Sequence, residues 1–414
     1  MPCAGAWQPE RGSEEQLWNS KSREVSSESV TVGHATPRCT SSTGEANRKL
    51  YRVVAMNTLL AFALALASTT SVRGCTEIHV RAATGQLVIA NAEESGLYSG
   101  TKATPTLRGS AHGGHAAGCM RFNATYGWIG NMNERGLVLN EHALDLARYQ
   151  TADKVLPTLC RPDVVAWILG LHATVAEVVA GLAAVRLTGP DGGGQWGVTD
   201  ALGRAVVLEY VKGELRAHNN TAIGIMTNDP TYDWHVNNLN NYVALSPSWY
   251  TDNSKVTIQV DDDAQYPWVH GAYDTDVPVV PTPIGHAYNL LGLPGDGSPP
   301  ARFIRAFFLR QYAYLHAPPA SLDDAKILAT ELLNSVYKVL GSVAARDASD
   351  PLETTPESTL HVPATREVFF RSRADMTWRR IDLTQLDFSP TATRKSVEVV
   401  HGEFGFVDVT KELL

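Results

Sequence analysis

The stretch that decides the fold is Cys75-Thr-Glu-Ile-His-Val-Arg-Ala-Ala-Thr-Gly-Gln-Leu-Val-Ile-Ala-Asn91. Apolar and polar residues alternate from Cys75 to Ala82, a pattern with the period of a half-buried strand. Thr84-Gly85 suits a tight turn, and residues 86–91 return as a buried strand. The sequence therefore predicts a β-hairpin whose first residue is Cys75.

The segment before this hairpin has the profile of a signal peptide. A short basic stretch precedes the apolar run Leu59 to Ala67, which is too short to cross a bilayer as a helix of about 20 residues. Val72 and Gly74 then occupy the small-residue positions of a cleavage site before Cys75. We expect residues 56–74 to be removed and the mature protein to be secreted or extracytoplasmic, without stable membrane insertion. A membrane anchor and a lipoprotein whose thiol is lipidated remain alternatives, although Arg73 fits a lipoprotein motif poorly.

Residues 1–55 differ from the rest of the chain. They are rich in Ser, Glu, Thr and Gly and lack spaced apolar positions, so they could not offset the entropy cost of folding. We interpret them as disordered or as a mis-assigned leader, because Met56 is a natural start for the signal peptide. Residues 75–414 contain no internal repeat and no clear linker, which favours a single domain.

The composition of the chain argues against nucleic-acid binding and metal binding. The chain carries a formal net charge of −8 and no run of Lys or Arg, so it lacks the basic surface that binding to nucleic acid requires. Asp261-Asp262-Asp263 is more typical of a solvated loop than of a cation site, because consecutive carboxylates point in different directions. We expect no metal and no cofactor.

The three cysteines of the mature chain are Cys75, Cys119 and Cys160. An odd number in an oxidising compartment favours one disulfide, Cys119–Cys160, with Cys75 as the free thiol. The alternative is that Cys119 and Cys160 are small buried residues. Two Asn-x-Thr sequons begin at Asn123 and Asn219 and are compatible with glycosylation.

The order of predicted elements is hairpins, a helix pair, hairpins, more helices and final strands. This order is expected when two antiparallel sheets stack face to face between helix layers, an αββα sandwich. The predicted strands are 126–132, 137–140, 196–199, 205–211, 215–225, 367–371, 377–383 and 397–401. The predicted helices are 164–169, 178–187, 231–241, 302–315 and 321–343.

Three residues carry candidate chemistry. An N-terminal Cys75 would offer a thiol as nucleophile and an α-amine, of pKa about 7.7–8.0, as a built-in base. Arg302 follows a Pro- and Gly-rich loop at the entry of a helix, where it could steady a thiolate or be an ordinary surface residue, as we interpret Arg305. Asn228 ends a strand, and its amide could donate to an oxyanion or cap the next helix.

In order and spacing, these motifs resemble the choloylglycine hydrolase and penicillin V acylase family. The motifs are Cys75-Thr76, Met132-Asn-Glu-Arg-Gly-Leu137, Asp200-Ala-Leu-Gly203 with Glu209-Tyr210, Thr227-Asn-Asp-Pro230, Leu293-Pro-Gly-Asp296 through Arg302-Phe303, and Trp378-Arg-Arg-Ile-Asp382. The resemblance implies the N-terminal-nucleophile fold, cleavage of linear non-peptide amides, and a homotetramer. It also implies roles for Cys75 as nucleophile and base, Asn228 as oxyanion donor and Arg302 as charge partner.

Two positions depart from the family pattern. The family has an Arg and, three residues later, an Asp after the first hairpin, where this chain has Asn91 and Glu94. Glu94 can replace the Asp with a longer reach, but Asn91 lacks the charge and the five donors of Arg. The residue whose backbone amide completes the oxyanion hole falls near Ala143.

Two hypotheses follow for the function. The first is a cofactor-free hydrolase that cleaves the amide of a small N-acyl substrate through Cys75. The second is a secreted or lipid-anchored binding protein that keeps the fold but, without an Arg at position 91, has weak catalysis or none.

Overall fold

The computed structural model describes residues 74–95, 102–245, 290–344 and 352–399. The pattern of internal contacts divides the chain into two units, Met1–Thr70 and Ser71–Leu414. The predicted leader, the predicted signal peptide up to residue 73, and Asp261 to Asp263 all lie outside the described residues.

Two antiparallel sheets form the centre of this unit. The first has the order β14-β1-β2-β16-β17-β18, with β15 paired to β16, and the second has the order β13-β12-β11-β8-β7-β6. The first comprises β14 (Ile225–Met226), β1 (Gly74–Arg81), β2 (Leu87–Ser95), β15 (Val343–Ala344), β16 (Leu352–Val362), β17 (Glu367–Ser372) and β18 (Arg379–Asp382). The second comprises β13 (Glu214–Asn219), β12 (Ala205–Val211), β11 (Gly193–Thr199), β8 (Val138–Leu144), β7 (Met132–Asn133) and β6 (Trp128–Ile129).

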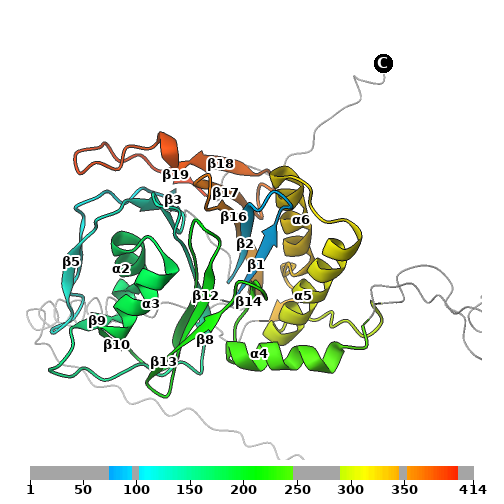
Figure 1. Cartoon of the computed structure of the whole chain (residues 1–414), viewed down its shortest axis with the longest axis horizontal. Helices are drawn as coiled ribbons and strands as arrows, with labels where there is room; N and C mark the ends of the chain where they lie inside the picture. Colours follow the sequence, from blue (N-terminus) through cyan, green and yellow to red (C-terminus); the bar gives the residue numbers. More distant parts are fainter. Residues whose placement is uncertain (1–73, 96–101, 246–289, 345–351, 400–414) are drawn as a thin grey trace, which may run out of the picture. The chain divides into compact units, whose positions relative to one another are not determined.

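Helices cover the outer face of each sheet (Figure 1). The first sheet carries α5 (Pro299–His316) and α6 (Leu322–Ser335), whose buried side chains share a core with Ile78 and Val80 of β1. The second carries α2 (Val164–Leu171) and α3 (Val175–Ala183), which pack in a core around Trp196. A smaller apolar cluster that includes Ile89 and Met132 lies between the sheets. The predicted αββα sandwich is therefore confirmed.

The remaining elements are short. Three two-stranded pairs join β9 (Thr158–Cys160) to β10 (Arg186–Thr188), β3 (Lys102–Ala103) to β19 (Val397–Glu398), and β4 (Ala111–Gly113) to β5 (Arg121–Asn123). The helix α4 (Tyr232–Asn238) continues into a 3-10 turn at Leu239–Tyr242, and further 3-10 turns lie at Arg161–Asp163 and Leu383–Gln385. Within the described residues, none of the helices combines the length and the apolar character that a membrane span needs.

In the first hairpin, each side chain points either to the helix layer or to the second sheet. Side chains alternate along a strand, so Ile78 and Val80 point to the helix layer while Cys75 and Glu77 point to the second sheet. Glu77 shows this directly, because its carboxylate accepts a hydrogen bond from Asn140 of β8 at 2.7 Å. Asn91 pairs with Glu77 in the register and shares its face, whereas Glu94 lies opposite Gly74 on the helix face.

The cysteine prediction and the sequon positions can be followed in the structure. Cys119 and Cys160 form a disulfide with a Cα–Cα distance of 5.6 Å, and Cys75 is not part of a disulfide. The alternative of two unlinked buried cysteines is therefore excluded. Asn123 and Asn219 are both exposed, as a glycosylated asparagine must be.

Several predicted element boundaries are wrong for identifiable reasons. The predicted strand 126–132 is divided by a turn at Gly130-Asn131, where both residues have positive φ. The predicted helix 178–187 ends at Ala183, because residues 186–188 form β10 against β9. The predicted strand 215–225 stops at Asn219, and the chain turns before β14 through Gly224, whose φ is +57°.

The largest error concerns the region after α6. The predicted helix 321–343 ends at Ser335, since the backbone carbonyl of Lys338 accepts a hydrogen bond from Thr355 N at 3.1 Å instead of continuing the helix. The strand β16 to which Thr355 belongs was not predicted, because Pro356 interrupts it in the sequence. The structure accommodates this proline at a shift of register between Thr354 and Glu357, as expected for a bulge.

Candidate active site

Cys75 lies near the start of β1, with its side chain 2% exposed. Its backbone nitrogen donates a hydrogen bond to Asn228 Oδ1 at 3.0 Å. In the full chain this nitrogen is the amide that follows Gly74. Gly74 is closely surrounded, because a Cβ atom there would lie 2.8 Å from carboxylate oxygens of both Glu94 and Glu353.

Arg302 brings the predicted site residues together. Ser298 caps α5 with its side chain, which places Arg302 in the first turns of the helix, fully buried against β1. Its guanidinium donates to Asn228 Oδ1 at 2.7 Å and to the Cys75 carbonyl at 2.8 Å, and it also contacts Thr76 Oγ1. It lies 3.0 Å from Glu94 Oε1. Arg302 is therefore a buried hub and not a surface residue.

The Glu94 carboxylate forms ion pairs with two side chains, Arg302 and Lys338. Besides Arg302, Lys338 places its Nζ 2.7 Å from Glu94 Oε2 and 3.0 Å from Glu353 Oε1. Neither Lys338 nor Glu353 was predicted from the sequence, since Lys338 follows α6 by three residues and Glu353 belongs to the unpredicted strand β16. No sequence motif marks them, and only the pairing of β2 with β16 brings them to the site.

Asn228 is positioned from both sides. The helix after it is capped at Thr231, so Asn228 is not the helix cap that its place in the sequence allowed. The Asn228 backbone carbonyl lies 2.8 Å from His235 Nε2, and the preceding Thr227 carbonyl accepts from Gln195 Nε2 at 3.0 Å. The Asn228 side-chain nitrogen donates to the Ala143 carbonyl at 3.3 Å.

Ala143 belongs to β8, and its backbone carbonyl faces Asn228. Gly194, its register partner on β11, uses both its N–H and its carbonyl to bond the Tyr149 hydroxyl. The Ala143 carbonyl instead faces Asn228. The N–H and C=O of one strand residue point to the same side, so the Ala143 amide also points toward the Asn228 side.

Asn91 has an uncharged partner. Its side-chain amide lies 3.0 Å from His142 Nε2, and His142 Nδ1 lies 2.9 Å from the Thr227 carbonyl. Burial lowers the pKa of His142 to about 4, so the ring is neutral at pH 7 and carries one N–H. That proton belongs on Nδ1, which donates to Thr227, and the Asn91 amide must then be turned to donate its own N–H to Nε2.

A second buried polar group lies beside Asn91 on the same face. Glu77 accepts from Asn140 and lies 2.7 Å from His79 Nε2. Burial raises the pKa of Glu77, but the hydrogen bonds from His79 and Asn140 and the electrostatic effect of the nearby histidines outweigh it and lower the pKa overall. Beside Asn91, this face therefore holds an ionised carboxylate.

The surroundings of the Cys75 thiol disfavour its ionisation. Burial raises the pKa of Cys75 well above its ordinary value, and the negative charges of Glu93 and Glu94 raise it further. A backbone hydrogen bond from Glu94 and the charge of Arg302 oppose this increase without cancelling it. Activation of the thiol therefore needs an additional positive charge nearby.

Arg305 is not the surface residue that the sequence suggested. It donates to the carbonyls of Ser335 and Pro294, each at 2.7 Å, and to the Asp296 carbonyl at 3.1 Å. It therefore fastens the loop before α5 to the end of α6. This explains how the loop holds Arg302 in place.

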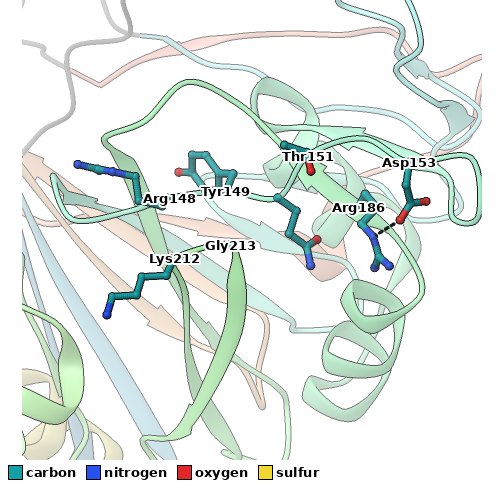
Figure 2. A pocket seen from close by; sticks show the side chains of 8 residues that line it. Arg148, Tyr149, Thr151, Asp153, Arg186, Lys212 and Gly213 are labelled. Atoms are coloured by element: carbon teal, nitrogen blue, oxygen red, sulfur yellow. Dashed lines mark hydrogen bonds and ion pairs between the residues drawn. The ribbon is translucent and has the colours of Figure 1, made fainter.

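A hollow of about 540 Å³ lies elsewhere on the surface (Figure 2). Its walls include none of the residues around Cys75. Two of its cations are paired, since Arg186 Nε lies 2.7 Å from Asp153 and Arg148 Nε lies 3.4 Å from Asp191. The lining residues are Arg148, Tyr149, Gln150, Thr151, Asp153, Arg186, Lys212 and Gly213.

Comparison with known proteins identifies related sequences. The model of the linear amide C–N hydrolases, choloylglycine hydrolase family, matches residues 117–397. A bile salt hydrolase/transferase of Clostridium perfringens is 32% identical over 183 residues, which cover 42% of this chain and 48% of that protein. One of Lactiplantibacillus plantarum is 31% identical over 191 residues, covering 43% and 51%. The chain thus aligns with about half the length of these curated relatives.

Solved structures show the same fold. A variant of conjugated bile acid hydrolase from Clostridium perfringens superposes with a TM-score of 0.65 and 21% identity, covering 81% of this chain and 99% of that one. Penicillin V acylase from Agrobacterium tumefaciens superposes with a TM-score of 0.58 and 22% identity, covering 79% and 93%. Both likenesses extend through most of the described residues.

Proposed function

Because the chain belongs to the choloylglycine hydrolase family of linear amide C–N hydrolases, we propose that it hydrolyses the amide of a small N-acyl substrate through Cys75. The relatives named as bile salt hydrolases make conjugated bile acids the first substrates to test, followed by phenoxyacyl penicillins. The proposal assigns Cys75 as nucleophile and base, with Asn228, Ala143, Arg302 and Glu94 around it. No cofactor enters the reaction.

The observation that carries this proposal is the convergence on Asn228 Oδ1. The backbone nitrogen of Cys75 and the guanidinium of Arg302 both donate to this one oxygen, at 3.0 and 2.7 Å. Cleavage before Cys75 would convert the nitrogen into an α-amine already held by Asn228. Such an amine is placed to act as a base for the thiol of the same residue.

The proposed reaction has two steps. The α-amine takes the thiol proton, the thiolate sulfur bonds to the amide carbonyl carbon, and the carbonyl oxygen becomes an oxyanion. The N–H groups of Asn228 and Ala143 would donate to this oxyanion. The amine proton passes to the leaving nitrogen as the C–N bond breaks, and water then hydrolyses the thioester to release the acid and the thiol.

Cleavage also supplies the charge that the uncleaved site lacks. A protonated α-amine beside the sulfur stabilises the thiolate and lowers its pKa, against the effects of burial and of the two glutamates. We therefore expect the uncleaved chain to be inactive and the cleaved chain to be active. Removal of residues 56–74 by a signal peptidase would place the enzyme outside the cytoplasm.

The N-terminus tests the mechanism most directly. Intact mass and N-terminal sequencing of the exported protein should give a chain that begins at Cys75 with a free amine. A lipidated Cys75, or a chain that begins elsewhere, would refute the proposed base. Light scattering on the same sample would test the proposed homotetramer.

The nucleophile is tested with Cys75→Ala and Cys75→Ser in a panel of N-acyl amides. We expect hydrolysis to fall at least about a thousandfold in Cys75→Ala, which leaves only the binding and oxyanion contributions. It should also fall in Cys75→Ser, whose hydroxyl is a weaker nucleophile than the thiolate. Unchanged thermal unfolding would show that both variants fold. Undiminished hydrolysis would exclude the thiol as nucleophile.

The second candidate is a secreted or lipid-anchored binding protein. The observation that favours it is Asn91, which occupies the place of the family arginine and contacts a neutral histidine. This candidate predicts saturable binding of an N-acyl amide by the chain that begins at Cys75, without turnover. Accumulation of a thioester after mixing with substrate would decide for the enzyme.

A further inference from the structure

A cluster of Glu209, His218 and Asp233 lies apart from Cys75. Glu209 is on β12, His218 is on the neighbouring strand β13, and Asp233 is in the first turn of α4 (Figure 1). One potential ligand atom from each residue lies within 4.8 Å of the other two. Two neighbouring strands of one hairpin and a following helix therefore present a nitrogen and two carboxylates to one point.

The closest pair has the spacing of metal ligands. His218 Nε2 lies 3.2 Å from Glu209 Oε2. Bonds of about 2.0–2.1 Å to a tetrahedral zinc ion place adjacent ligand atoms about 3.3 Å apart. Asp233 is exposed, and its carboxylate lies within 4.8 Å of both of these atoms.

The two atoms are close enough for an ion pair when the imidazole is protonated, but they make no hydrogen bond of normal geometry. Within the described parts of the chain, neither Glu209 Oε2 nor His218 Nε2 has a hydrogen-bond partner, although they lie 3.2 Å apart. Glu209 is fully buried, and a buried carboxylate oxygen without a donor is costly. A cation between the two atoms would satisfy both lone pairs at once.

The surroundings hold the ligands in place. Glu209 Oε1 accepts from the Tyr232 backbone N–H at 2.7 Å, which fixes the direction of Oε2. Asp233 accepts from Thr231 Oγ1 at 2.5 Å, and this hydrogen bond is the main cause of its lowered pKa. Arg216 Nη1 approaches Asp233 at 3.9 Å and is the cation that a metal ion would compete with.

We propose that Glu209, His218 and Asp233 form a binding site for a divalent transition metal, with zinc as the probe. One imidazole and two carboxylates suit zinc and its neighbours better than magnesium, which prefers oxygen ligands only. The bound ion would fasten the first turn of α4 to β12 and β13, close to the segment that holds Asn228. This inference does not depend on the proposed hydrolase activity.

The test uses the full chain in a Cys75→Ala background, so that the free thiol cannot bind metal. After dialysis against zinc, we expect one zinc per chain by elemental analysis and a melting temperature raised by roughly 2–5 °C in excess zinc. His218→Gln and Asp233→Asn should each weaken zinc binding by at least the roughly 10- to 100-fold loss typical when a group supporting a ligand is removed. Both should also lose the rise in melting temperature.

Two controls separate metal binding from a general loss of stability. Asp323→Asn removes an exposed carboxylate from the first turn of α6, the position that matches Asp233 in α4, and should leave zinc binding unchanged. His218→Cys supplies a different ligand at the same place, so it should retain zinc and give a cobalt–thiolate absorption with Co²⁺. Substoichiometric zinc in the parent chain would overturn the proposal. So would full zinc retention by His218→Gln, or an equal loss in Asp323→Asn.

Discussion

The two faces of the β1–β2 hairpin beside Cys75 have opposite electrostatic character. On the helix face, Glu94 lies between Arg302 and Lys338, and all three side chains are buried and charged. On the face toward the second sheet, Asn91 contacts a neutral His142. The difference shows that this chain keeps its cations behind the strand, where Arg302 holds the Cys75 carbonyl and Lys338 holds Glu94.

This contrast predicts unequal costs for removing residues from the two faces. A buried charge that loses its partner costs more than a neutral group that loses one hydrogen bond. The following substitutions test that order, beginning with the largest expected effect.

Arg302→Met should have the largest effect on stability. It removes the guanidinium from Glu94, Asn228 and the Cys75 carbonyl together, so we expect the free energy of unfolding to fall by about 3–5 kcal/mol. Urea unfolding at pH 7 measures this loss. Glu94→Gln added to Arg302→Met should recover part of it, because no unpaired buried charge then remains. A loss below about 1 kcal/mol for Arg302→Met would contradict the importance of the helix face.

Part of the pH dependence of stability should come from the face between the sheets. The pKa of His142 is about 4 in the folded state and about 6.5 when unfolded, so the unfolded chain binds more protons between these values. Stability is then present above pH 6.5 and is lost as the pH falls toward 4. The buried His235, whose pKa is also about 4, adds to the same loss.

His142→Gln isolates one histidine of this pair. Urea unfolding between pH 6.5 and 4 should give a slope smaller by up to about 1.4 kcal/mol per pH unit, the value for one proton. His316→Gln changes an exposed histidine and should leave the slope as it is. A slope unchanged in His142→Gln would mean that this ring is not buried in its neutral form.

Lys338→Met should cost less than Arg302→Met. Glu94 keeps its contact with Arg302, and the second partner of Lys338, Glu353, is half-buried and can reach water. We expect the free energy of unfolding to fall by about 1–3 kcal/mol. Lys326→Met is the matched control, since Lys326 pairs with the exposed Asp323, and such pairs contribute less than about 1 kcal/mol. Equal losses in the two variants would show that Lys338 is not part of the buried group.

Asn91→Ala should have the smallest effect of these substitutions. It leaves His142 Nε2 without its neighbour at 3.0 Å, for an expected loss of about 1 kcal/mol. The same unfolding assay measures it, alongside Asn240→Ala, whose side chain is exposed and donates only to the carbonyl of Asn237. A loss as large as that of Arg302→Met would reverse the contrast between the two faces.

The sequence by itself determined the hairpin, the αββα order of elements and the group formed by Cys75, Asn228, Arg302 and Glu94. Period-two alternation and ordered motifs are local signals, and they survive in the linear chain. The family resemblance implied Ala143 as the backbone donor, and the structure shows its carbonyl accepting a hydrogen bond from Asn228.

Only the tertiary structure decided which charges meet. Lys338 reaches Glu94 because β16 pairs with β2 across a bulge at Pro356, and a proline in the sequence hides that strand. His142 reaches Asn91 because two sheets stack face to face. Glu209, His218 and Asp233 converge from two strands and a helix. Such contacts depend on register and packing between distant segments, and no local pattern of residues encodes them.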